Sequence, residues 1–338
     1  MKIIENKNLK KYNTFGIDVN AKYFVEINDE NDLLKLIDSE IFLNNKHFVL
    51  SGGSNVLFLR DYNGLIIKMN IKSIQIIEET DEYALISVGA GENWHKFVEY
   101  CVNNGYYGLE NLAYIPGLVG SAPVQNIGAY SVEQCDYFYN LRGYNLLTNN
   151  FISLDNADSN FAYRYSIYKR ILKNKFIITN VVYKLNKHFS PNLNYKELKE
   201  RFDGKNPLAK EVFDAIIEIR KSKLPEPEKI GNAGSFFKNP TVSQEKYLEL
   251  KQNYSDINGF ETPSGIKLSA AYLIEKCGLK GKKFSMNSDA RVYEKHSLIL
   301  VNYNNASGED IFNLSTEVIN KVHNKFGIEL EREVNVVK

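Results

Sequence analysis

The spacing of hydrophobic residues along the chain predicts several amphipathic helices. Between Trp94 and Val102 the apolar residues recur at intervals of three, four, seven and eight positions, which line one face of an α-helix. Gly105 follows shortly afterwards, as expected of a residue that ends a helix. The same pattern predicts helices over residues 29–37, 212–217, 270–277 and 311–322.

Short apolar runs predict β-strands. They cover residues 47–50, 65–68, 73–77, 176–185 and 297–301. The tail from residue 328 instead alternates as a strand does, with Ile328, Leu330, Arg332 and Val334 on one face and Glu329, Glu331 and Glu333 on the other. Such a row of carboxylates is usually the solvated face of a strand, but one of them can be catalytic if that face borders a pocket.

Two loops are rich in glycine. Residues 51–58, Ser-Gly-Gly-Ser-Asn-Val-Leu-Phe, follow a predicted strand and form either an ordinary tight turn or a loop whose backbone N–H groups bind phosphate. Residues 105–130 contain two prolines and several glycines, yet they remain apolar. A long structured loop of this kind favours a ligand-binding segment over a purely structural one.

The segment 88–94, Val-Gly-Ala-Gly-Glu-Asn-Trp, resembles a dinucleotide-binding turn only in part. The third glycine of that fingerprint allows helix and strand to pack closely, and Trp94 occupies its position here. We therefore reject a dinucleotide-binding fold of that type. His95, in the first turn of the predicted helix, is interpreted as a solvated or capping residue.

The decapeptide 231–240, Gly-Asn-Ala-Gly-Ser-Phe-Phe-Lys-Asn-Pro, predicts a tight loop with a polar tip. Its glycines allow the backbone to bend, and its two phenylalanines can anchor the turn in a core. Ser235, Lys238 and Asn239 can then point into a pocket. From these residues alone, an ordinary packed turn remains the alternative.

Two further residues have ambiguous surroundings. Arg164 lies among aromatic residues in the segment 161–168, which slightly favours a surface cation–π residue over a buried clamp for carboxylate or phosphate. Tyr195 lies in the polar segment 186–208 and by itself indicates packing rather than function.

The prolines of residues 223–227 mark a domain boundary, since neither can continue a helix.

Composition narrows the class of protein. A chain of 338 residues is long enough for two or three domains, and 43% hydrophobic with 25% charged residues is typical of a soluble globular protein. A net charge of +1 gives no reason to expect nucleic acid or a membrane surface as a partner. Three widely separated cysteines and five scattered histidines argue against a disulfide framework and a metal site. We expect a cytoplasmic protein.

Seven motifs in register carry a family resemblance. They are Asn-Thr-Phe-Gly at 13–16, Ser-Gly-Gly-Ser-Asn at 51–55, Gly-Ala-Gly-Glu-Asn-Trp at 89–94, Ile-Pro-Gly at 115–117, Gln-Asn-Ile-Gly-Ala-Tyr at 125–130, Tyr-Arg-Tyr-Ser at 163–166 and the decapeptide at 231–240. In this order they resemble the UDP-N-acetylenolpyruvoylglucosamine reductases, FAD- and NADPH-dependent enzymes of bacterial peptidoglycan precursor synthesis. The segment containing Tyr195 resembles the extra loop of the longer family type.

The resemblance implies an α+β flavoprotein of three domains. Residues 1–70 and 71–224 would form the two FAD-binding subdomains of a vanillyl-alcohol-oxidase-like fold, with the C-terminal strand 326–338 returning to the second. Residues 225–325 would form an α+β substrate-binding domain. The resemblance also implies a monomer whose ligands are FAD, NADPH and UDP-N-acetylglucosamine enolpyruvate.

The resemblance also implies the ligand contacts. The residues expected to bind FAD are Ser51, Gly52, Gly53, Ser54, Asn55, Ile115, Pro116, Gly117, Gly120, Ser121, Asn126, Ile127, Gly128, Ala129 and Arg220. Those expected to bind substrate or nicotinamide dinucleotide are Tyr130, Tyr195, Lys223, Asn239 and His296. Two departures from the family pattern are Ala122, where a hydroxyl is expected before Pro123, and Ser131, where the family usually has glycine.

The family reaction adds hydride and a proton to the enolpyruvyl double bond, and three residues suit it. Hydride addition pushes negative charge onto the substrate carboxylate, which needs a cation and a nearby acid. Arg164 and a protonated Glu333 suit those two roles. Ser235 is the candidate general acid, because the enol-type intermediate is a strong enough base to take a proton from a serine.

Two other functions remain possible on the sequence alone. One is an FAD-dependent sugar or alcohol oxidase of the same fold, which would be reoxidised by oxygen. That reaction needs a base to accept a proton from substrate, which the set Ser235, Arg164 and Glu333 does not provide. The other is a non-catalytic nucleotide-sugar-binding or flavin-binding protein, which the presence of all three candidate catalytic residues disfavours.

Overall fold

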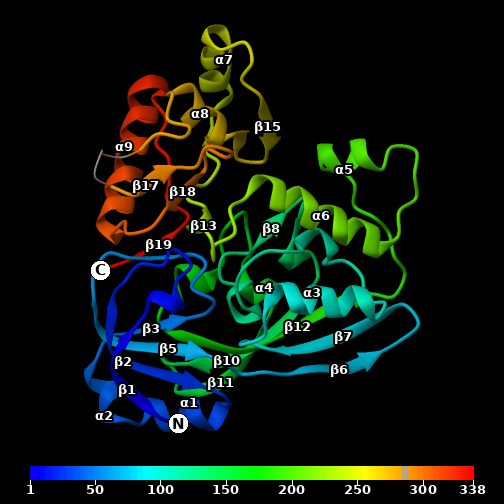
Figure 1. Cartoon of the computed structure of the whole chain (residues 1–338). Coiled ribbons are helices and arrows are strands. Elements are labelled where there is room, and N and C mark those ends of the chain that lie inside the picture. Colours follow the sequence, from blue (N-terminus) through cyan, green and yellow to red (C-terminus); the bar gives the residue numbers. More distant parts are fainter. Residues whose placement is uncertain (284, 286–287) are drawn as a thin grey trace. The chain divides into compact units, whose positions relative to one another are not determined.

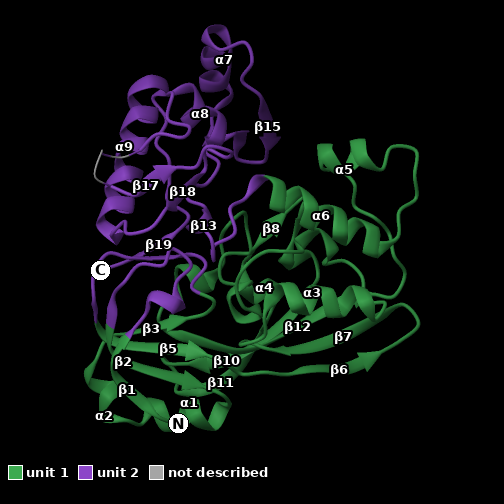
Figure 2. Cartoon of the chain, in the orientation of Figure 1, with its two compact units in different colours: residues 1–7, 21–52, 63–222 green, residues 8–20, 53–62, 223–338 purple. Residues whose placement is uncertain are grey.

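The chain forms two compact units in the computed structural model, which describes residues 1–283, 285 and 288–338. Unit 1 comprises Met1–Lys7, Ala21–Gly52 and Asn63–Ser222, and unit 2 comprises Asn8–Asn20, Gly53–Tyr62 and Lys223–Lys338 (Figure 2). Both units mix helices and sheets (Figure 1), in agreement with the α+β class expected from the sequence. The boundaries of a three-domain division stay a prediction.

The first sheet of unit 1 has four strands in the order β1 (Ile3–Asn8), β2 (Asn20–Ile27), β5 (Tyr62–Met69) and β3 (His47–Leu50). β3 and β5 run parallel, and Leu50 pairs with Lys68 where both strands end. Helix α1 (Glu30–Ile37) begins where the Asp29 side chain accepts the backbone N–H of Asp32. Leu33, Leu36 and Ile37 then pack with the sheet in a shared core, while α2 (Glu40–Asn44) follows directly.

The second sheet of unit 1 has five strands in the order β11 (Asn150–Asp155), β10 (Phe138–Asn145), β12 (Phe176–Asn186), β7 (Tyr83–Gly89) and β6 (Ile74–Glu79). Helices α3 (Trp94–Asn103) and α6 (Ala209–Lys223) share one hydrophobic core with these strands. Trp94, Phe97 and Tyr183 lie at its centre with ring centroids 5.6–6.1 Å apart. This large core gives the loops around it a fixed support.

Residues 104–131 contain only short elements, as the sequence predicted for a long structured loop. These are the 3₁₀ turns Glu110–Leu112 and Val119–Ser121 and the strand β8 (Gly128–Ala129), which pairs with β9 (Val132–Glu133). A third 3₁₀ turn, Gln134–Asp136, and the short helices α4 (Asn156–Ser159) and α5 (Lys196–Arg201) complete this part of unit 1.

The described residues of unit 2 form two three-stranded sheets and three α-helices. One sheet has the order β13 (Gly231–Ser235), β18 (Ile299–Asn302) and β17 (Ala290–Val292), and the other has β14 (Thr241–Val242), β16 (Gly265–Leu268) and β15 (Gly259–Thr262). The helices are α7 (Gln244–Asn253), α8 (Ala270–Lys276) and α9 (Gly308–Phe326). The last strand, β19 (Asn335–Val337), runs parallel to β4 (Val56–Phe58).

The structure confirms the five predicted helices and corrects two other predictions. Residues 231–235 form strand β13 rather than a tight loop, although Phe236 and Phe237 are buried as expected. The tail is regular strand only in β19; before it, Arg332 makes a single bridge to Phe237. The predicted alternation persists in burial, with Ile328, Leu330 and Val334 inside and Glu329 and Glu331 exposed.

Candidate functional site

The glycine loop after β3 lies against the Ile-Pro-Gly loop of unit 1. A Cβ built on Gly52 would be 2.7 Å from the Cα of Gly117, so the two backbones touch. Beside them, the Ser51 hydroxyl donates to the Ser121 hydroxyl oxygen at 2.9 Å. Glycine is required at position 52 because no other residue permits this approach. The expected cofactor residues 51, 52, 117 and 121 therefore meet in one place.

Lys68 adds a cation to this glycine loop, and the sequence analysis missed it. Its ammonium donates to the Ser51 carbonyl at 2.8 Å. Partial burial, helped by the nearby charge of Lys72, lowers the pKa of Lys68 to about 8. The sequence did show a lysine at the end of a predicted apolar strand. What it did not show is that this strand runs parallel to the strand before the glycine loop.

The glycine loop continues into unit 2, where Gly53 adopts a φ of +66°. A Cβ there would lie 2.0 Å from the Tyr12 carbonyl oxygen, so glycine is again required. The Thr14 backbone N–H donates to the Gly53 carbonyl at 3.1 Å. The Asn55 amide, in turn, donates to the Glu333 carbonyl at 3.4 Å. Ser54 and Asn55 are half-buried.

Asn126 organises the second expected cofactor loop. It is fully buried, and its φ of +45° is unusual for a residue with a side chain. Its amide donates to the Glu133 carboxylate at 2.7 Å, and its side-chain oxygen accepts the backbone N–H of Cys135 at 3.2 Å. Ile115, Ile127 and Ala129 pack, partly buried, against the main core of unit 1. Pro116 is exposed, and Gly120 lies against Ala90.

Arg164 is tied to this same loop. Its guanidinium donates to the Gly128 carbonyl at 2.6 Å and to the Asn126 carbonyl at 3.3 Å, and it lies 3.8 Å from the Glu133 carboxylate. The side chain is only 17% exposed, although it also lies over the Tyr163 ring. The surface interpretation of Arg164 is therefore wrong, because the loop 126–128, far away in sequence, folds over it.

Tyr130 and Tyr195 come together although 65 positions separate them. Their ring centroids are 4.7 Å apart in a T-shaped arrangement. Burial raises the pKa of the Tyr130 hydroxyl, and it lowers the pKa of the Arg220 guanidinium nearby. Arg220 also donates to the Tyr114 carbonyl at 3.2 Å. This part of unit 1 thus joins two expected substrate residues and one expected cofactor residue.

His95 is a packing residue rather than a solvated one. Its ring stacks on Phe213 at 5.5 Å, and its Nδ1 accepts the backbone N–H of Tyr114 at 3.1 Å. Burial lowers the pKa of His95, which favours the neutral ring that can accept this bond. His95 therefore supports Tyr114, whose φ is +59°, within the long loop.

Glu333 is hydrogen-bonded through its backbone to the residue that follows Ser235 in unit 2. The Glu333 backbone N–H donates to the carbonyl of Phe236 at 2.8 Å, so the glutamate lies beside the residue that follows Ser235. The sheet register is irregular between Asn232 and Ser235, where Gly234 has a φ of +68°. This irregularity leaves Ser235 exposed at the end of β13.

The remaining expected ligand residues of unit 2 have structural partners. The Asn239 side-chain oxygen accepts the backbone N–H of Ala270 at 3.0 Å, at the start of α8. Burial, reinforced by the charges of Lys223 and Lys280, lowers the pKa of His296. Lys223 and His296 therefore lie close enough to interact electrostatically.

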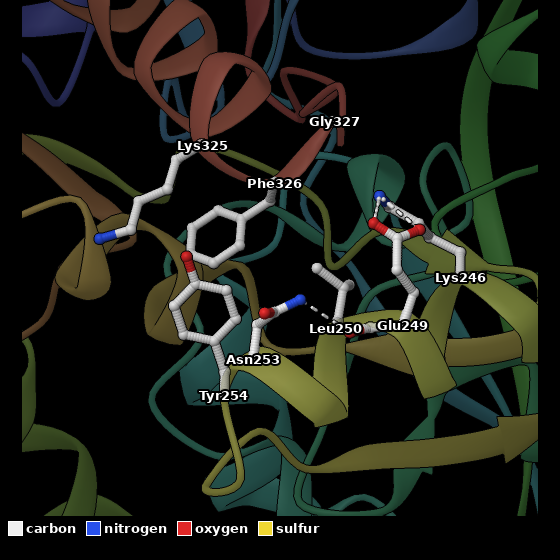
Figure 3. A pocket seen from close by; sticks show the side chains of 8 residues that line it. All are labelled: Lys246, Glu249, Leu250, Asn253, Tyr254, Lys325, Phe326 and Gly327. Carbon is white, nitrogen blue, oxygen red and sulfur yellow. Dashed lines mark hydrogen bonds and ion pairs between the residues drawn. The ribbon is translucent and has the colours of Figure 1, made fainter.

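A separate cavity of about 490 Å³ lies between α7 and the end of α9. Figure 3 shows the Tyr254 and Phe326 rings side by side in it, and their centroids are 5.0 Å apart. Lys246 pairs with Glu249 at 2.9 Å, and the Lys325 ammonium lies over both rings. The sequence-predicted site residues do not line this cavity.

Two other features are absent from the described part of the chain. Within residues 1–283, 285 and 288–338, no group of three or more His, Cys, Asp or Glu side chains is arranged to hold a metal ion. Over the same residues, no helix is both long and apolar enough to cross a membrane.

The residues of unit 1 fit a flavin nucleotide. Gly52 and Gly117 leave space only for backbone, Ser51 and Ser121 present hydroxyls, and Lys68 supplies positive charge beside them. Comparison with known families agrees, since residues 21–150 match the FAD binding domain. The chain is thus an FAD-dependent oxidoreductase.

The particular family follows from three further findings. Residues 226–337 match the C-terminal domain of UDP-N-acetylenolpyruvoylglucosamine reductase. Reductases of that name from Flavobacterium johnsoniae and Neisseria gonorrhoeae are 41% and 43% identical, covering 100% and 97% of this chain and 100% and 95% of their own. The chain belongs to the UDP-N-acetylenolpyruvoylglucosamine reductase family.

A solved structure supports the fold. The crystal structure of UDP-N-acetylenolpyruvylglucosamine reductase from Thermus caldophilus has a TM-score of 0.68 at 22% identity, covering 100% of this chain and 98% of that one.

Proposed function

We propose that the chain uses NADPH to reduce UDP-N-acetylglucosamine enolpyruvate to UDP-N-acetylmuramate. The observation that carries the residue assignment is the hydrogen bond from the Glu333 backbone N–H to the Phe236 carbonyl, because it holds the backbone of Glu333 one position along the chain from Ser235. A bound FAD would supply the transfer of hydride from NADPH to the terminal carbon of the enolpyruvyl group. The Ser235 hydroxyl then donates a proton to the second carbon, which completes saturation of the double bond.

Charge on the substrate carboxylate must be stabilised between these two transfers. We assign this to the Arg164 guanidinium and the Glu333 carboxyl group. Arg164 suits the role because backbone carbonyls and a 3.8 Å approach to Glu133 hold its planar group in one orientation. Glu333 suits it because backbone bonding to residue 236 fixes its position.

Binding of the ligands is assigned to the residues that the family motifs indicate. Residues 51–55, 115–121 and 126–129, with Arg220, are proposed to hold FAD; Lys68 joins them. Tyr130, Tyr195, Lys223, Asn239 and His296 are proposed to bind substrate or NADPH. The T-shaped contact between Tyr195 and Tyr130 supports a role for the segment 186–208 at the substrate. We further propose that the enzyme acts as a cytoplasmic monomer.

Stopped-flow absorbance of the Ser235→Ala enzyme tests the proposal, since oxidised and reduced flavin differ in colour. We expect NADPH to bleach the flavin at the wild-type rate, and added enolpyruvyl substrate to restore the colour about 10³-fold more slowly. Ser264→Ala, which removes an exposed hydroxyl of unit 2, is the matched control and should reoxidise normally. Normal reoxidation in Ser235→Ala would remove that residue from the mechanism, and peroxide formed without NADPH would indicate an oxidase instead.

A further inference from the structure

The segment that carries Glu333 is held against residues 236–238 as a short antiparallel ladder. Lys238 donates its backbone N–H to the Glu331 carbonyl at 2.9 Å, and Glu333 donates to the Phe236 carbonyl at 2.8 Å. Phe237 and Arg332 form the bridge between these two bonds. On the face of Glu331, the Lys238 ammonium also pairs with the Glu331 carboxylate at 2.7 Å, and its side chain is only 15% exposed.

Arg332 holds the opposite face of this segment to helix α9. Its Nε donates to the Ser315 hydroxyl and its Nη2 to the Thr316 hydroxyl, both at 2.7 Å. The guanidinium also lies over the Phe312 ring, 4.5 Å from the centroid. The Ser315 and Thr316 hydroxyls each donate a hydrogen bond to the Phe312 carbonyl, so both hydroxyl oxygens are oriented to accept.

Placing the Arg332 charge here is a costly way to stabilise the fold. Burial lowers the pKa of Arg332, which reports that its charge is partly removed from water. No carboxylate of the described residues lies within 4.0 Å to compensate; the partners are two neutral hydroxyls and a ring. What the planar fork provides is a defined orientation, because two separate donors must meet two adjacent residues of one helix.

Helix α9 is a rigid support for the two hydrogen bonds of Arg332. A capping box at Ser307 and Asp310 closes its beginning, and Gly327 in the left-handed conformation, with φ +66°, closes its end. Successive side chains of an extended segment point to opposite faces. Locking Arg332 to α9 therefore turns the Glu333 side chain to the other face, the one that the Lys238–Glu331 pair occupies.

We propose that Arg332 is the positioning residue for Glu333: its two hydrogen bonds to α9 set the orientation of the carboxyl group in the reaction. This rests on the function proposed above, in which Glu333 stabilises charge on the substrate carboxylate. Arg332 does not touch the reacting atoms. It acts only through its neighbour in the chain.

The test separates the two half-reactions in Arg332→Met, which keeps the aliphatic stem but removes the fork. We expect reoxidation by the enolpyruvyl substrate to slow by about 10–100-fold, the effect of misplacing a reacting group by an ångström or less, while reduction by NADPH changes by less than about twofold. Arg332→Lys, which can reach one hydroxyl, should recover part of the loss. Unchanged reoxidation, or equal slowing of both half-reactions, would overturn the proposal.

The Glu333→Gln background shows whether Arg332 works through Glu333. There, Arg332→Met should cause no further slowing, because the group it positions is already changed. The same loss in both backgrounds would refute positioning. If Glu333→Gln itself reoxidises at the wild-type rate, the assigned role of Glu333 fails; if it is slow but Arg332→Met is normal, only the positioning role fails.

Two variants control for folding. Arg291→Met removes an arginine of β17 that likewise lies over an aromatic ring, 4.7 Å from the centroid of Tyr303. Both half-reactions should stay normal in this variant. Should Arg332→Met not fold, the double variant Ser315→Ala/Thr316→Val removes the acceptors instead and must show the same selective loss in reoxidation. A double variant with wild-type reoxidation would contradict the proposal.

Discussion

The Arg164 guanidinium donates to the Gly128 carbonyl at 2.6 Å while its own backbone adopts a φ of +54°. A residue with a side chain pays about 1–2 kcal/mol for that left-handed conformation. Arg164 shares it with Asn126, Tyr130 and Ser131, all in or beside the loop that it contacts. Strained backbone gathered in this way is typical of sites where geometry serves function.

Replacing Arg164 by lysine tests whether the fork or only the charge matters. Lysine cannot reach the carbonyls of residues 126 and 128 together, so we expect the rate of flavin reoxidation by substrate to fall about 100-fold despite the retained charge. Arg170→Lys, at an exposed position of the same segment, should be unaffected. Wild-type turnover in Arg164→Lys would show that the reaction does not need the planar group.

Replacing Gly52 by alanine tests the contact between the two loops of unit 1. The added methyl group would lie 2.7 Å from the Gly117 Cα, so the loops must separate, and overpacking of this kind costs about 1–3 kcal/mol. We expect purified Gly52→Ala to lose most of its yellow colour and to bind added FAD weakly in fluorescence titration. Gly204→Ala, where nothing lies within 4 Å of the new carbon, should keep its flavin.

The lowered pKa of Lys68 should make the stability of the flavin-free protein depend on pH. Its folded pKa of about 8 lies below the value near 10.4 of an unfolded lysine. Between these values the unfolded chain binds one more proton, so this group makes stability rise with pH. Lys68→Met should therefore be more stable than wild type at pH 7, by about 2 kcal/mol, and the difference should shrink towards pH 10. Urea unfolding at several pH values measures it; a constant difference would contradict the prediction.

The same lysine predicts how FAD affinity depends on pH. Phosphate favours the protonated ammonium, so FAD should bind with proton uptake once Lys68 begins to deprotonate near pH 8. We expect FAD affinity to fall by up to about tenfold per pH unit above that value in wild type. In Lys68→Met the affinity should be lower and independent of pH from 7 to 9. Equal slopes in the two proteins would exclude Lys68 from the flavin site.

We expect Ser131→Gly to raise the free energy of unfolding. Ser131 has a φ of +66° and an exposed side chain, which explains why glycine suits this position. Relief of strain outweighs the extra freedom of glycine in the unfolded chain, so we expect about 0.5–1 kcal/mol of stabilisation in urea unfolding. Ser264→Gly, at an exposed position without positive φ, should instead be neutral or destabilising.

The sequence predicted elements whose signals are local. Helix α9 is an example, because its apolar spacing and Gly327 lie within a few turns of each other. Strand β13 was missed since its glycines favour a turn, whereas pairing with β18, more than 60 positions away, decides the outcome. Pairing partners distant in sequence leave no local pattern.

Site residues were likewise misjudged or missed where their partners are distant in the sequence. Arg164 and His95 were misjudged locally because the loops that bury them come from residues 126–128 and 114. Lys68 was missed because only the parallel register of β3 and β5 brings it to the glycine loop. The family motifs gave the expected ligand residues, and the structure added the partners that hold them.

Unit 2 is assembled from three separate stretches of the chain, and β19 closes it by pairing with β4. The contacting residues Asn55 and Asn335 are 280 positions apart. During synthesis β4 must therefore wait without its partner strand until residues 335–337 have left the ribosome. Folding of unit 2 is thereby coupled to the synthesis of residues 331–337, because a chain interrupted before them lacks both β19 and the segment that carries Glu333.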